Sequence, residues 1–118
     1  MLTQWLERIV ATEMPAPDVV AFNIGLLETD KGFTAYLVGS KSYDPNNDDW
    51  ACNEDFTPTE RYCALPSMRS EDTWETVQHR VAEEMRAFLS KANVRTSFLG
   101  KAEAVTVGFD DGELLRVL

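Results

Sequence analysis

The stretch VVAFNIGLLETDKGFTAYLVGS, residues 19–40, decides the fold. Its first half alternates large apolar side chains with smaller ones, which predicts a strand over residues 18–28 with one strongly apolar face. That face carries Val20, Phe22, Ile24 and Leu26. Residues 29–32 have the composition of a tight turn, with Gly32 at the position that needs a positive φ. Residues 33–40 then form the returning strand, so the stretch predicts a β-hairpin.

A second hairpin is expected near the C-terminus. Residues 102–109 and 113–117 flank Asp110, Asp111 and Gly112, which repeat the aspartate and glycine chemistry of the first turn. A short strand over residues 61–65 would extend the same sheet. The sequence therefore predicts an antiparallel sheet of four or five strands.

Two helices are expected beside this sheet. Apolar spacings of three and four predict one helix over residues 2–13, which Pro15 and Pro17 end because neither has an N–H to donate. A second helix is expected to be capped by Ser70 and to end at Asn93, which would adopt a left-handed conformation. Its apolar stripe consists of Trp74, Val77, Val81, Met85 and Phe88. Both helices bury their stripes most simply on one face of the sheet, which predicts a two-layer α+β fold.

Size and charge limit the classes of function. A chain of 118 residues with 44% apolar residues suits a single domain, residues 1–118. Twenty acidic side chains against eleven basic ones give a net charge of −9, which repels nucleic acids and anionic membranes. No stretch approaches the roughly 18 apolar residues of a membrane span, and Glu7 interrupts any signal peptide. A cytoplasmic protein is expected, with neither nucleic acid nor membrane as partner.

The cysteine and histidine content argues against catalysis and structural zinc. Cys52, Cys63 and His79 are too few to build a four-ligand zinc site by themselves. Two free, buried or half-buried thiols are favoured over a disulfide in a cytoplasmic chain. His79 lies off the apolar stripe of its helix, which indicates an exposed residue rather than a base. No phosphate-binding loop, nucleophile elbow or other catalytic motif is present, so we expect a protein that is not an enzyme and has no cofactor.

The most unusual segment is residues 44–60, which contain no Lys or Arg. Its acidic residues are Asp44, Asp48, Asp49, Glu54, Asp55 and Glu60, and its aromatic residues are Trp50 and Phe56, with Tyr43 just before it. One interpretation is that the rings anchor a loop whose carboxylates are simply solvated. The other is that the segment presents an acidic surface with an aromatic centre to a basic partner. The partner-binding residues would then be Asp44, Asp48, Asp49, Trp50, Glu54, Asp55 and Phe56.

A calcium site is a weaker alternative for the same segment. Asp44, Asn46, Asp48 and Asp55 occupy the first, third, fifth and twelfth positions of an EF-hand-like spacing. However, Asp49 stands at the sixth position, where the sharp turn requires glycine, and the flanking sequences look extended. We therefore expect no metal.

Two runs carry a resemblance to a known class of protein: YDPNNDDWACNEDFTP, residues 43–58, and VTVGFDDGELLRV, residues 105–117. With the short, acidic α+β plan, they resemble the small immunity proteins encoded beside bacterial polymorphic or contact-delivered toxins. The resemblance implies a non-catalytic inhibitor that binds a basic toxin domain in the cytoplasm and covers its active site. In that case Asp48, Asp49, Glu54 and Asp55 would imitate phosphates, and Trp50 would be the central anchor.

Other classes stay open. A free edge of the sheet can pair with a second copy or another chain, as in a homodimeric or general interaction module. An enzyme with a poorly marked site would require a pocket that holds a perturbed titratable group.

Overall fold

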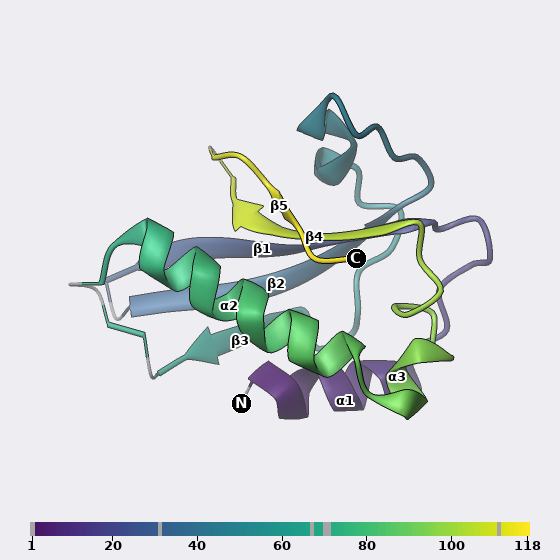
Figure 1. Ribbon diagram of the computed structural model, residues 1–118, viewed down its shortest axis with the longest axis horizontal. Helices are drawn as coiled ribbons and strands as arrows, with labels where there is room; N and C mark the ends of the chain where they lie inside the picture. Colours follow the sequence, from purple (N-terminus) through teal and green to yellow (C-terminus); the bar gives the residue numbers. More distant parts are fainter. Residues whose placement is uncertain (1, 31, 67, 70–71, 111) are drawn as a thin grey trace.

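The computed structural model describes residues 2–30, 32–66, 68–69, 72–110 and 112–118. In these parts of the chain, five strands form one sheet in the order β3-β2-β1-β4-β5. The helices lie on one side of the sheet, and the segment that follows β2 extends to the other side (Figure 1). The predicted two-layer α+β fold is confirmed.

The predicted central hairpin is present. Strand β1 (Ala21–Thr29) pairs antiparallel with β2 (Gly32–Ser40) along its whole length. Gly32 has a φ of 129°, in the region that favours glycine, so the turn uses this residue as its sequence indicates.

The outer strands complete a mixed sheet. Strand β3 (Tyr62–Leu65) pairs antiparallel with β2, and β5 (Leu115–Arg116) pairs antiparallel with β4 (Ala104–Phe109). Strand β4 lies parallel to β1, so the expectation of a purely antiparallel sheet needs this correction. The parallel pair arises because the chain crosses the helix layer between β3 and β4, the kind of connection that parallel neighbours require.

The helices are α1 (Leu2–Thr12), α2 (Trp74–Leu89) and the short α3 (Ala92–Arg95). The expected cap Ser70 lies outside the described residues; in the structure, the Thr73 side chain caps α2 by accepting from the Thr76 N–H at 3.2 Å. The expectation that Asn93 ends this helix in a left-handed conformation is wrong, because Asn93 lies within α3. Helix α2 ends instead through Ser90 in a right-handed conformation, with its N–H bonded to helix carbonyls.

The main core lies between the sheet and the helices. One face of β1 contributes Phe22, Ile24 and Leu26, as the alternation predicts, and α1 contributes Trp5 and Leu6. Val20, predicted for the same face, precedes β1 and packs instead against the cluster that contains Ala21 and Ala104. The α2 stripe is buried apart from Trp74, which is 54% exposed and therefore contradicts its predicted core position. Trp74 is the first residue of α2, where the helix projects beyond the core. His79 is exposed on α2, as predicted.

Gln78 ties α2 to the C-terminal strands. Its buried side-chain amide donates to the carbonyls of Val107 and Glu113, each at 2.9 Å. The bond to Val107 ties α2 to β4, and the bond to Glu113 ties α2 to the connection between β4 and β5. In the described parts of the chain, no helix is long and apolar enough to cross a membrane.

Candidate functional site: an acid-rimmed hollow on the open sheet face

Residues 41–60 follow β2 and first cover part of the sheet face that the helices leave open, before the chain returns to α1 at Glu60. They contain a short 3-10 helix, η1 (Asp48–Cys52), visible at the top of Figure 1. The Asn47 side chain begins η1 by accepting from the Asp49 N–H at 2.9 Å. We call residues 44–60 the acidic segment. At η1 it is ordered locally by its own polar side chains.

Trp50 attaches the acidic segment to the sheet. The side chain is 5% exposed and packs in a second apolar cluster with Ala21 of β1 and Ala104 of β4. The Tyr43 ring meets it edge to face, with 5.2 Å between ring centroids. The small residues of the open face thus make room for the indole, and Trp50 points inward rather than toward a partner.

Phe56 also points inward, at the margin of the main core. Its ring centroid lies 6.2 Å from that of Phe22 and 6.1 Å from that of Phe98. The backbone of Phe56 forms an isolated antiparallel bridge with Gly39. Trp50 and Phe56, which were predicted to contact a partner, therefore anchor the segment to two apolar clusters instead.

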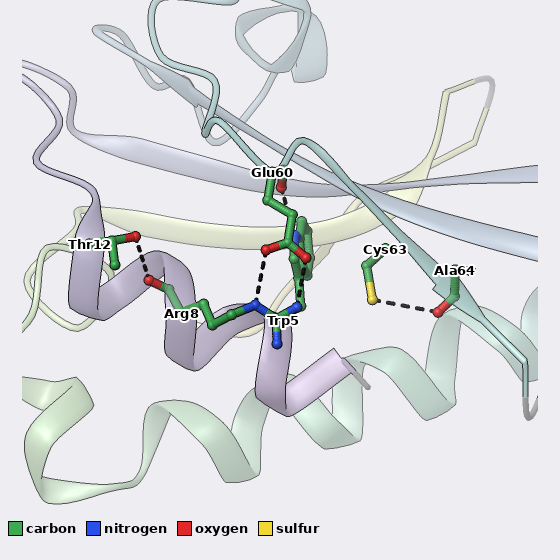
Figure 2. A network of polar contacts seen from close by, with 6 residues as sticks. All are labelled: Trp5, Arg8, Thr12, Glu60, Cys63 and Ala64. Atoms are coloured by element: carbon green, nitrogen blue, oxygen red, sulfur yellow. Dashed lines mark hydrogen bonds and ion pairs between the residues drawn. The ribbon is translucent and has the colours of Figure 1, made fainter.

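The end of the acidic segment is fastened to α1 on the helix side of the molecule (Figure 2). The buried Trp5 indole donates to the Glu60 carbonyl at 2.7 Å, and Arg8 forms an ion pair with the Glu60 carboxylate at 2.6 Å. The hydrogen bond from Arg8 lowers the pKa of Glu60. Glu60 is thus engaged by α1 and does not line the hollow described below.

Two further carboxylates shape the backbone of the segment. Asp44 accepts from the Asn46 N–H at 2.9 Å, and Asp55 accepts from the Lys41 N–H at 2.8 Å. Asp44 and Asp55 stand at the first and last positions of the EF-hand-like spacing, and both carboxylates are thus bonded to backbone N–H groups. Among the residues that the structure describes, no group of three or more metal-ligating side chains is gathered at one point.

Three carboxylates of the described residues line a hollow of about 370 Å³ between the acidic segment and the β4–β5 connection. Asp48 and Glu54 lie on the wall formed by the acidic segment, and Asp110 lies on the opposite wall. The floor is the open face of β1 and β2, represented by Asn23, Tyr36 and Val38. We call this site the acid-rimmed hollow. Asp49 is exposed on η1 next to Asp48.

The floor of the hollow is held by buried polar contacts. Thr106 donates to the Asn23 side-chain oxygen at 2.9 Å, and both residues are 4% exposed. The Tyr36 ring covers Gly25 so closely that a Cβ there would lie 2.0 Å from its Cζ. The Tyr36 hydroxyl donates to Asp110. Burial, reinforced by this hydrogen bond, raises the pKa of Tyr36 far above its ordinary value, so the phenol remains a neutral donor.

The charge at the rim is predominantly negative. Arg61 pairs with Glu54 at 2.7 Å, and Asp48 accepts from the Leu114 N–H at 3.3 Å. No Lys or Arg is among the described residues that line the hollow, so the Arg61 guanidinium offsets only part of the negative charge of Asp48, Glu54 and Asp110. A hollow with this excess attracts cationic groups.

The two thiols lie in different environments. Cys52 is exposed and lines the hollow, whereas Cys63 lies in β3 with its side chain buried, and this burial raises the pKa of its thiol. Both are free, as expected, but only Cys63 has the expected burial.

The sequence located part of this site. Of the seven predicted residues, Asp48 and Glu54 line the hollow, and Asp49 is exposed beside it. The side chains of Asp44 and Asp55 accept hydrogen bonds from nearby backbone N–H groups. Trp50 and Phe56 pack inward against apolar clusters. Asp110 was missed because its spacing to Gly112 is explained by the turn alone. Asn23 was also missed, although a polar residue in the middle of an apolar strand is a signal that could have found it.

Comparison of the chain with known protein families, curated proteins and solved structures finds no match.

Proposed function

We propose that the protein is a non-catalytic inhibitor of the immunity-protein type, which binds a basic toxin domain and covers that domain's active site. The observation that carries the proposal is the convergence of Asp48, Glu54 and Asp110 on one hollow. Asp110 lies more than fifty positions along the chain from the other two, so the fold, not local composition, brings them together. The overall charge of −9 would further speed the approach of a basic partner.

The roles of the residues differ from those expected of an exposed aromatic centre. The carboxylates of Asp48, Glu54 and Asp110, with the exposed Asp49 beside them, would contact the partner. Trp50 and Phe56 would hold these carboxylates in place, since both rings pack against the sheet. Carboxylates fixed by a rigid support lose little conformational entropy on binding, which favours affinity.

The geometry also supports binding rather than chemistry. His79 is exposed on α2 and does not line the hollow. The exposed Cys52 thiol has no basic side chain hydrogen-bonded to it among the described residues, as an activated nucleophile would. The carboxylates are arranged as a rim around an open surface, an arrangement suited to a complementary protein surface.

The proposal predicts that a toxin domain is encoded beside this protein's gene, and that domain is the binding partner for the test. The triple variant Asp48→Asn, Glu54→Gln and Asp110→Asn should bind that domain about 10- to 100-fold more weakly, mainly through slower association. Its affinity should also depend less steeply on salt, because the interaction it loses is electrostatic. Surface plasmon resonance at several salt concentrations measures both effects.

The matched control variant also removes three negative charges, but from positions outside the hollow. Glu83→Gln, Glu84→Gln and Glu103→Gln are exposed substitutions outside the hollow, and together they should leave the affinity within about 3-fold. Equal affinity and equal salt dependence for the rim variant and the original protein would refute the proposal.

A further inference from the structure

A second cavity, larger than the hollow, lies at the end of the sheet next to the start of α2. It has a volume of about 690 Å³, and Trp74 and Phe109 form its aromatic walls. Leu26 and Leu27 of β1 add apolar surface, and Glu28 and Asp110 add carboxylates. We call this cavity the Trp74 cleft. It adjoins the acid-rimmed hollow, because Asp110 lines both.

The aromatic walls are fixed at a right angle to each other. The ring centroids of Trp74 and Phe109 are 6.4 Å apart with an interplanar angle of 83°. Phe109 is held in turn by an edge contact with Phe33 at 6.0 Å. Trp74 is nevertheless 54% exposed, so most of its surface is free to receive another group.

Aromatic faces and carboxylates around one cleft favour a particular kind of ligand. The face of an indole ring attracts cations, and nearby carboxylates strengthen that attraction. The start of α2 carries a partial positive charge of about half an elementary charge, which opposes a cation. The carboxylates of Glu28 and Asp110 line the cleft and oppose this partial charge. Asp72 and Glu75 add negative charge at the same helix end, where Arg69 contributes one positive charge.

We propose that the Trp74 cleft receives an arginine side chain of the partner protein, with the guanidinium over the Trp74 ring and facing Glu28 and Asp110. Arginine fits better than lysine because its planar group stacks on an aromatic face and still donates hydrogen bonds at its edge. The cleft is large enough for that side chain together with adjoining backbone. This inference rests on the proposed function for the source of the arginine and adds a second contact beside the hollow.

Trp74 itself supplies the signal for a direct test. The chain has three tryptophans, of which Trp5 is 0% exposed, Trp50 is 5% exposed and Trp74 is 54% exposed. Titration with N-acetyl-arginine amide should therefore change the fluorescence of Trp74 in a saturable way, with a dissociation constant in the millimolar range. N-acetyl-citrulline amide has nearly the same shape without the charge and should give no saturable change.

Variants complete the test. Glu28→Gln should weaken binding of the arginine derivative on the order of 5-fold. Glu84→Gln, which removes an exposed charge farther along α2, should leave its binding affinity unchanged. Trp74→Phe should abolish the fluorescence response while leaving the fold intact, because the side chain is half exposed. An equal response to citrulline, or an unchanged dissociation constant for Glu28→Gln, would overturn the inference. Neither result depends on the toxin domain, so failure here is distinct from failure of the rim variant.

Discussion

Replacing Trp50 with alanine is expected to lower the free energy of unfolding by about 3–4 kcal/mol, the usual effect of removing a buried aromatic side chain. The indole fills the space between the acidic segment and the small residues Ala21 and Ala104, so its removal leaves a cavity that the sheet cannot close. The variant should also bind the toxin domain more weakly, because Asp48 and Glu54 would lose their fixed positions. Denaturant unfolding followed by circular dichroism measures the first effect.

Trp74→Ala is the matched control for this substitution. It removes the same side chain from a half-exposed position, so its effect on the free energy of unfolding should stay within about 1 kcal/mol. Equal losses for the two variants would mean that Trp50 does not support the acidic segment as the structure indicates.

Replacing Trp5 with alanine is expected to lower the free energy of unfolding by about 3–5 kcal/mol. Trp5 is fully buried in α1, and its indole also satisfies the Glu60 carbonyl. The variant therefore loses core packing and the fastening of the acidic segment to the helix layer. Trp5→Phe should lose less, because it keeps much of the packing and removes only the hydrogen bond and part of the ring.

The neighbouring ion pair provides the contrast. Arg8→Ala removes the contact with Glu60, but both side chains are largely exposed and the pair is screened by solvent. Its unfolding midpoint should be close to that of the original protein. A loss for Arg8→Ala as large as that for Trp5→Ala would show that the ion pair, rather than the indole, fastens the segment.

Local patterns in the sequence were sufficient for most of the fold. Alternation in β1 and the glycine at position 32 specify the central hairpin, and helical spacing specifies the buried faces of α1 and α2. The parallel pairing of β1 with β4 was not predictable in this way, because it depends on how the chain crosses the helix layer. Trp74 has the right spacing for the α2 stripe, yet it lies beyond the region that the core covers.

The candidate site was harder to predict because it combines distant segments. The charge of the acidic segment was visible, but nothing local shows that Trp50 and Phe56 turn inward while Asp48 and Glu54 face the hollow. Asp110 joins them only through the β4–β5 connection, which a hydrogen bond from Gln78 to Glu113 ties to α2. Spacing alone carries no information about such contacts.

The central claim, that the hollow is a negatively charged surface open to cations, can be measured without any partner. Cys52 lines the hollow and is exposed, whereas Cys63 is buried, so Cys52 reports the local potential. At low salt, a trimethylammonium-bearing methanethiosulfonate should react with Cys52 faster than its sulfonate-bearing counterpart. Relative to the same pair of reagents on N-acetyl-cysteine amide, the preference should be about 10-fold. It should largely disappear in the Asp48→Asn, Glu54→Gln, Asp110→Asn variant, whereas a rate ratio equal to that of the free thiol would contradict the claim.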